Sequence, residues 1–145
     1  MLCAMSTTQV RTTVQTIYPS VRYNDAKAAI VWLKTALGFE EKEVCTGDGD
    51  TIAHAELHLA GNLIMLGSVK DDPYGTSPKN LGGVTGGIYI AFDSAADVDS
   101  RYARAKATGA EIIRELEDTD YGSHEFGVRD PEGHIWSFGT YRPQA

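Results

Sequence analysis

Residues 121–138 read Tyr-Gly-Ser-His-Glu-Phe-Gly-Val-Arg-Asp-Pro-Glu-Gly-His-Ile-Trp-Ser-Phe. Two segments rich in β-forming residues, Ser123 to Arg129 and His134 to Tyr141, flank the tetrapeptide Asp130-Pro131-Glu132-Gly133, which has strong turn chemistry. The stretch therefore predicts a closing β-hairpin. A further strand is expected just before it, from about Glu111 to Glu117.

The residues before these strands predict a strand followed by a helix. Ile88, Ile90 and Phe92 alternate within Gly87 to Asp93, as expected for a half-buried strand. The helix is expected to begin after Ser94, a good N-cap residue, and to run to about Thr108 before Gly109. Residues 85–142 thus form one β-α-β-β-β module.

The same order occurs earlier in the chain, in residues 16–69. A strand at Ile17 to Tyr23 precedes a helix from about Asp25 to Leu37, which Gly38 ends. Three strands follow, and these are Glu40 to Cys45, Ile52 to Leu59, and Leu63 to Val69. The two modules are offset by about 70 residues, which indicates a duplicated unit. We expect an α+β fold of two βαβββ modules joined by a loop at 70–84, after a flexible lead-in at 1–15.

Composition excludes several classes of function. The formal net charge of the 145 residues is −7, which argues against binding to nucleic acid phosphates. No apolar run reaches the roughly 18 residues of a membrane helix, so we expect no membrane partner. Cys3 and Cys45 lack metal or redox spacing, and we expect free thiols in a reducing cytoplasm.

The sequence resembles the vicinal-oxygen-chelate superfamily, which includes glyoxalase I, the bleomycin-resistance proteins and the extradiol dioxygenases. The resembling segments are 21–25, 32–39, 86–92 and 121–138. The resemblance implies curved mixed sheets around a cleft, with helices outside. It also implies a homodimer, since members commonly dimerise, with clefts formed within one chain or between two. The chain looks most similar to the metal-free bleomycin-resistance branch.

Metal-dependent members of that superfamily carry His, Glu or Gln at four cleft positions. The resemblance places these positions at Tyr18, Met65, Gly87 and Ser137. Glycine offers no side chain, and Met, neutral Tyr and Ser are poor ligands for a hard divalent ion. We therefore expect neither a catalytic metal nor a cofactor.

Strand alternation divides the remaining side chains between the two faces of each sheet. Ile17, Val21, Ile88 and Trp136 share the parity that faces the helices. The residues expected to line the ligand cleft are Tyr18, Arg22, His54, Glu56, Met65, Tyr89 and Ser137. Apolar walls with a few polar groups are typical of small-molecule sites.

Binding of a small organic molecule without catalysis, such as sequestration of an antibiotic or toxin, is the function that these features favour. The negative net charge suits a cationic ligand. Two alternatives stay open. In the first, Glu56 is a catalytic acid–base residue, paired with His54 or His58 on the same strand face. In the second, the protein is a metal-dependent lyase, isomerase or dioxygenase of the same superfamily.

Overall fold

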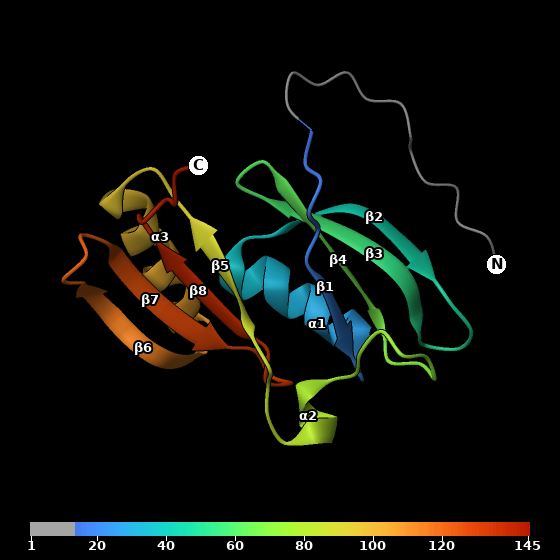
Figure 1. Ribbon diagram of the computed structural model, residues 1–145. Helices are drawn as coiled ribbons and strands as arrows, with labels where there is room; N and C mark the ends of the chain where they lie inside the picture. Colours follow the sequence, from blue (N-terminus) through green and yellow to red (C-terminus); the bar gives the residue numbers. More distant parts are fainter. Residues whose placement is uncertain (1–13) are drawn as a thin grey trace.

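The computed structural model describes residues 14–145 and contains two four-stranded sheets, which lie side by side in Figure 1. In each sheet the first strand of the module pairs in parallel with the fourth, and the other pairs are antiparallel. The first sheet has the order β1 (Ser20–Tyr23), β4 (Asn62–Ser68), β3 (Ile52–Leu59), β2 (Glu40–Thr46). The second has the order β5 (Gly87–Ala91), β8 (Ile135–Gly139), β7 (His124–Arg129), β6 (Glu111–Asp118). The α+β fold of two βαβββ modules is confirmed.

The helix of the first module has two parts. Helix α1 (Ala26–Trp32) begins where the Asp25 carboxylate accepts a hydrogen bond from the N–H of Ala28, at 3.0 Å. It continues as a π-helical segment, η1 (Leu33–Leu37), and ends at Gly38, whose φ of 81° is left-handed. The sequence predicted the extent of this helix but not its π-helical last turn.

Helix α3 (Ala95–Ala107) of the second module packs beside η1 and fastens the two modules together. The Arg101 guanidinium donates to the carbonyl oxygen of Leu37 at 3.3 Å. Arg104 donates to the carbonyl oxygens of Lys34 and Thr35, both at 2.9 Å. Cations at a helix C-terminus satisfy carbonyls that have no partner within the helix.

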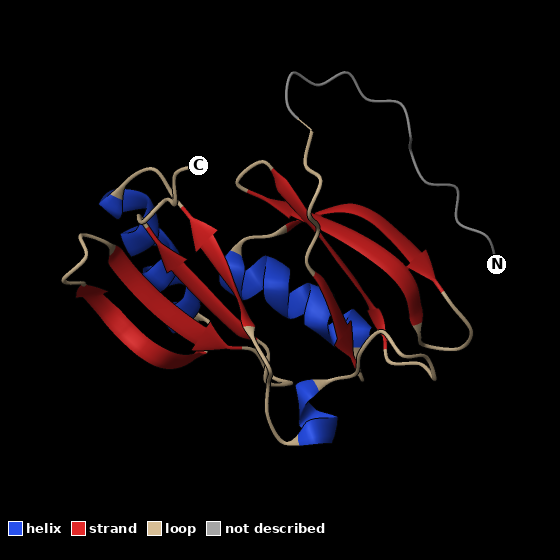
Figure 2. Cartoon of the chain, in the orientation of Figure 1, coloured by secondary structure: helices blue, strands red, loops and turns tan. Residues whose placement is uncertain are grey.

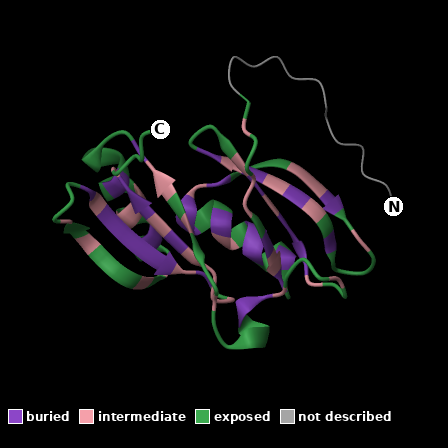
Figure 3. Ribbon diagram, in the orientation of Figure 1, coloured by how far each residue is buried: buried purple, intermediate pink, exposed green. Residues whose placement is uncertain are grey.

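Both modules share one hydrophobic core between the sheets and the helices. Leu33 and Leu57 of the first module and Val98, Phe126 and Trp136 of the second all lie in it with no exposed surface. Figure 3 shows buried residues along α1 and the inner strands of both sheets. The burial of each large apolar side chain contributes roughly 1.5–3 kcal/mol to stability, so the sheets and helices hold one another in place.

Two expectations about local structure are wrong. Strand β1 begins at Ser20 rather than Ile17, directly after Pro19, which cannot donate a backbone hydrogen bond to a sheet. Ile17 consequently lies outside the strand, and it is 84% exposed instead of facing the helices. The expected loop at 70–84 contains a short helix, α2 (Pro78–Leu81), visible in Figure 2.

The expectation of two free thiols is also wrong, because Cys45 is disulfide-bonded. Cys3 and most of the expected lead-in at 1–15 lie outside the described residues. None of the helices formed by residues 14–145 combines the length and apolar character that a bilayer crossing requires.

A second set of hydrogen bonds joins the two modules, and it is centred on Asp130 in the hairpin between β7 and β8. Asp130 is 4% exposed, and one of its carboxylate oxygens accepts from the Tyr23 hydroxyl of β1 at 2.6 Å and from Trp136 Nε1 at 3.0 Å. The other oxygen accepts from the N–H groups of Glu132 and His134, both at 3.0 Å. Burial, followed by the charge of Asp130, raises the pKa of Tyr23 well above its usual value, so this hydroxyl stays a donor.

We expect Asp130→Ala to destabilise the protein by about 3–5 kcal/mol, because buried donors from both modules lose their acceptor. Urea unfolding measures this change. Asp71→Asn removes an exposed carboxylate and serves as the control, with an expected change within about 0.5 kcal/mol. Equal stabilities of the two variants would contradict the fastening role of Asp130.

Candidate functional site

The candidate site lies between the two sheets, where the edge strands β1 and β5 face each other without pairing. Two adjoining cavities of about 570 and 630 Å³ open along these strands. Four residues line both cavities, and these are Ile17, Pro19, Ile88 and Tyr89. We call this combined space the β1–β5 groove.

Apolar side chains form most of the wall of the β1–β5 groove. The smaller cavity is lined by Val21, Leu81, Val84 and Ile135 in addition to the shared residues. The larger cavity reaches toward the helices and is lined by Phe39, Leu59, Leu63, Ile64, Ile90 and Phe92. Concave apolar walls of this size are typical of small-molecule sites, which have volumes of roughly 300–1,000 Å³.

Two tyrosines add hydrogen-bonding groups to the apolar wall. The Tyr18 hydroxyl donates to the carbonyl oxygen of Gln15 at 2.8 Å, and the Tyr89 hydroxyl donates to that of Tyr141 at 2.6 Å. Burial raises the pKa of Tyr89 above its usual value, so its hydroxyl stays neutral at physiological pH. The Tyr18 hydroxyl oxygen therefore keeps a lone pair that can accept a bond from a ligand, whereas the Tyr89 hydroxyl lies over Gly139 next to Ser123 Oγ.

Gly139 of β8 sets the position of the Tyr89 ring. A Cβ atom at Gly139 would come within 2.7 Å of Tyr89 Oη and Glu125 Cγ, and within 2.9 Å of Ser123 Oγ. The absence of a side chain at this position allows these three groups to converge above the sheet. Tyr89 thus lies across β8 because residue 139 is a glycine.

Glu125 lies on the same face of the second sheet. Its carboxylate is buried, but its negative charge is paired with the positive charge of Arg114. One of its carboxylate oxygens accepts from the Tyr121 hydroxyl at 2.6 Å and from Arg114 Nη1 at 3.0 Å. Arg114 also pairs with Glu117 at 2.6 Å. Glu125 therefore has its donors supplied by the protein.

Three of the predicted cleft residues lie on the first sheet, away from the two cavities. His54 Nε2 and Glu56 Oε2 are 2.9 Å apart on β3, and both side chains are partly buried. Met65 of β4 lies opposite Glu56 in the sheet register. None of these three residues lines either cavity of the β1–β5 groove.

Arg22 and Ser137 complete the predicted set. The Arg22 guanidinium pairs with Asp72 of the loop between the modules at 3.1 Å, which leaves its side chain 15% exposed. Ser137 lies between Tyr89 and Gly127 in the register of the second sheet and does not line the groove. The structure thus brings Tyr18 and Tyr89 together in one cavity and separates them from the other five.

The sequence reasoning missed the apolar residues of the groove. Ile17 does not have the helix-facing position that its parity predicts, because it is 84% exposed and lines both cavities beside Pro19. Ile88 packs against the core as predicted, and it lines both cavities as well. Pro19 is the available signal, because a proline at the start of a predicted strand indicates a free edge. A free edge at β1 is what leaves room for the groove.

The residues at the four positions that the resemblance assigns to metal ligands do not suit a divalent ion. Gly87 has no side chain, and a Cβ atom there would lie only 3.3–3.4 Å from Ile135 atoms. Met65 offers a thioether, while Tyr18 and Ser137 offer neutral hydroxyls. Within residues 14–145, no group of three or more His, Cys, Asp or Glu side chains is arranged to hold a metal ion.

Known proteins share this sequence pattern and fold. The family described as the Glyoxalase/Bleomycin resistance protein/Dioxygenase superfamily matches residues 13–138. The uncharacterized protein Mb0911c of Mycobacterium bovis is 32% identical over 124 residues, which cover 83% of this chain and 80% of that protein. The crystal structure of TioX from Micromonospora sp. ML1 has a TM-score of 0.66 and 29% identity, and covers 88% of this chain and all of its own.

The fosfomycin resistance protein FosX from Listeria monocytogenes, in complex with Mn(II) and sulfate, shares the fold at lower identity. Its TM-score is 0.62 at 13% identity, with 92% of this chain and 95% of FosX covered.

We expect Gly139→Ala to destabilise the protein by about 1–3 kcal/mol, because the added methyl group overpacks the space that holds Tyr89 and Glu125. Thermal unfolding measures the change, and the tyrosine ring signals in NMR report the displacement of Tyr89. Gly86→Ala is the matched control, because its Cβ meets no atom within 4 Å. A Gly139→Ala protein as stable as this control would refute the crowding.

Proposed function

The chain belongs to the glyoxalase/bleomycin resistance protein/dioxygenase superfamily, and from this membership we propose that it binds a small organic molecule in the β1–β5 groove without a catalytic metal. The observation that carries the proposal is the apolar groove itself, with Tyr18 and Tyr89 in its wall. A groove of about 570 and 630 Å³ suits a compact organic ligand.

The walls indicate the chemistry of the ligand. The flat Tyr89 ring and the aliphatic side chains of Ile88 and Ile135 beside it favour a ligand with a planar or aliphatic body. The Tyr18 hydroxyl oxygen can accept a hydrogen bond, which favours a donor on the ligand. The net charge of −7 attracts a cationic ligand at long range.

Sequestration is the role that we infer for this binding. The ligand would be an antibiotic or another toxic compound, and the protein would hold it without chemical change. The description of FosX as a fosfomycin resistance protein gives a precedent for antibiotic-related function within the same fold. We further propose a homodimer located in the cytoplasm.

Binding can be tested with Nile red, a neutral fluorescent dye of suitable size. Tyr89→Ala should weaken dye binding about tenfold, because the ring forms part of both cavities. Tyr74→Ala is the control, because Tyr74 is 85% exposed and lies outside the groove. Equal dye affinity of the two variants would count against the groove, whereas a small organic molecule co-purified with the chain and seen by native mass spectrometry would support it.

The metal-free part of the proposal has its own measurement. Elemental analysis of protein purified without a metal-affinity tag should find only substoichiometric divalent metal, because the four family positions lack suitable donors. One tightly held divalent ion per chain would contradict this part and favour a metal-dependent lyase, isomerase or dioxygenase.

A second candidate function is acid–base catalysis at the His54–Glu56 pair. The 2.9 Å contact between these partly buried side chains is the observation that favours it. If the pair is catalytic, Glu56→Gln should abolish turnover of any substrate found, while Glu41→Gln on the surface should not. Unchanged turnover in Glu56→Gln would remove this role.

A further inference from the structure

One wall of the β1–β5 groove is the free edge of strand β5. Among residues 14–145, β5 pairs only with β8, so its other edge faces the groove. The backbone groups of successive residues in a paired strand point alternately to its two edges. The N–H of Phe92, directly after β5, donates to the carbonyl oxygen of Gly139 at 2.8 Å, on the β8 side. The residues of opposite parity, which are Gly87, Tyr89 and Ala91, therefore direct their N–H and C=O groups into the groove.

These groove-facing backbone groups have no partner in the part of the chain that the structure describes. No other residue of 14–145 donates to them or accepts from them. Strand β1 on the opposite side of the groove offers less, because the carbonyl oxygen of Arg22 accepts from His134 Nε2 at 2.9 Å. The unused backbone hydrogen-bonding capacity of the groove thus lies mainly on β5.

The other edges of the two sheets carry features that hinder the addition of a strand. Strands β2 and β6 pair with shifts in register, and both contain several charged residues, among them Glu41 and Arg114. Strand β1 follows Pro19 and contains Arg22. Charges, prolines and bulges are the usual protection of a free edge. The β5 sequence Gly-Ile-Tyr-Ile-Ala has no charge and no proline, so this edge is open to an additional strand.

The two cavities of the groove follow β5 along its whole length. Residues 87–89 line the smaller cavity, and residues 88–91 line the larger one. Because a strand rises about 3.3 Å per residue, a peptide of about four or five residues matches the length of β5. The larger cavity also offers apolar side chains, such as Phe39, Ile64 and Phe92, to the side chains of such a peptide.

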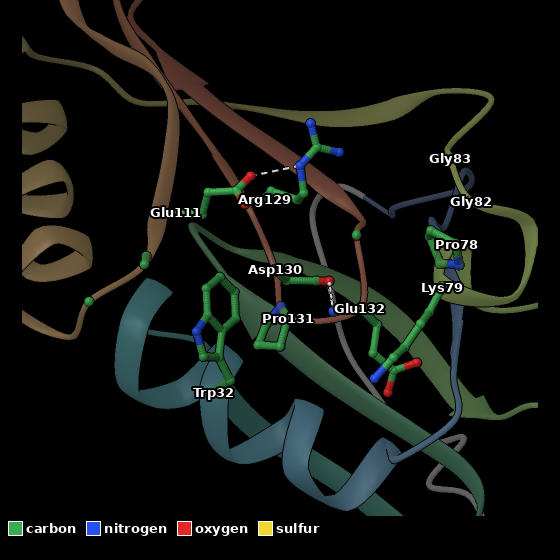
Figure 4. Close-up of a pocket in the computed structure, with 13 residues that line it drawn as sticks. Trp32, Pro78, Lys79, Gly82, Gly83, Glu111, Arg129, Asp130, Pro131 and Glu132 are labelled. Carbon is green, nitrogen blue, oxygen red and sulfur yellow. Dashed lines mark hydrogen bonds and ion pairs between the residues drawn. The ribbon is translucent and has the colours of Figure 1, made fainter.

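The end of the groove near α2 is held in place by the β7–β8 hairpin. The Ser77 hydroxyl donates to the Glu132 carboxylate at 2.5 Å. Pro78 packs closely against Gly133, where a Cβ atom would come within 3.0 Å of Pro78 Cβ. Figure 4 shows residues 78–83 beside this hairpin. A wall that is already ordered loses little conformational entropy when a ligand enters.

We propose that the ligand of the β1–β5 groove is a short extended peptide that adds to β5 as a further strand. This inference rests on the proposed function, because it names the class of ligand for the same groove. The peptide backbone pairs with the groove-facing N–H and C=O groups of Gly87, Tyr89 and Ala91. In strand addition the main-chain hydrogen bonds give affinity, and the pockets for alternate side chains give specificity. Apolar side chains at alternate positions of the peptide enter the larger cavity.

Hydrogen exchange followed by NMR, with the capped peptide acetyl-Thr-Val-Thr-Val-amide, tests this pairing. Its β-branched residues favour the extended conformation. Exchange at the Tyr89 and Ala91 amides should be about tenfold slower or more at saturating peptide. The Ile88 and Ile90 amides, which already bond to β8, should change little and serve as the internal control. Failure of the peptide to bind would overturn the proposal, as would bound peptide without slower exchange at Tyr89 and Ala91.

Two methylated forms of the peptide are matched probes of its orientation. One carries N-methyl groups on both threonines and the other on both valines, so each lacks the N–H groups of one edge. Because one edge pairs with β5, one form should bind about tenfold more weakly than the other. Equal affinities would contradict strand addition. Binding of Nile red without binding of the unmethylated peptide would reject the peptide and leave the groove as a small-molecule site, whereas binding of neither would reject both proposals.

Discussion

The geometry of the protein depends on one buried carboxylate, that of Asp130, because it accepts hydrogen bonds from both modules. Tyr23 donates from β1 of the first module, and Trp136 donates from β8 of the second. Each hydrogen bond to a charged group contributes roughly 1.5–3 kcal/mol, and an ionised carboxylate so deeply buried is tolerated only when its donors are supplied. Asp130 therefore fixes β1 relative to the strand that pairs with β5.

The β1–β5 groove lies between the hydrogen bonds to Asp130 and the contacts that α3 makes with η1. Arg101 and Arg104 bind the carbonyl oxygens at the end of η1, on the helix side of the groove. Both sets of contacts hold the two modules together without hydrogen bonds between β1 and β5. The edges of these two strands therefore stay apart. The groove is thus a consequence of how the modules are joined, and its residues need not belong to either module's own core.

The sequence predicted the two βαβββ modules because their signals are local. Strand alternation, the Ser94 cap and the glycines that end the helices act within a few residues, and the Asp-Pro-Glu-Gly turn needs no distant partner. Helix α2 has local signals, with Ser77 as its N-cap, Pro78 in its first turn and the left-handed Gly82 after it, but its four residues are too few to show a period. The π-helical turn at Leu33–Leu37 and the disulfide at Cys45, in contrast, depend on tertiary contacts. No periodicity in the sequence encodes such contacts.

The candidate site was predictable only in part, for the same reason. Tyr18 and Tyr89, two of the residues predicted for a ligand cleft, line one cavity, although Tyr18 lies outside strand β1. Strand parity could not show that the loop between the modules supplies Asp72, which takes the Arg22 guanidinium as its partner. Nor could it show that Ile17 leaves the strand at Pro19 and lies in the groove instead of the core. Strand parity predicts which face of a sheet a side chain lies on. It does not predict whether another residue of the protein already forms a hydrogen bond or ion pair with that side chain.

Side-chain packing around the predicted ligand positions also limits which substitutions could create a metal site in this protein. A carboxylate or imidazole at position 87 would need the space that Ile135 fills, since even a Cβ atom there would lie 3.3–3.4 Å from Ile135. A new carboxylate at position 65 would need a compensating charge, because desolvation strongly disfavours an unpaired ion. Introducing a ligand donor at position 87 would therefore also require a smaller residue at position 135. At position 87 the lack of a donor and the apolar wall that Ile135 forms are thus two aspects of one packing arrangement.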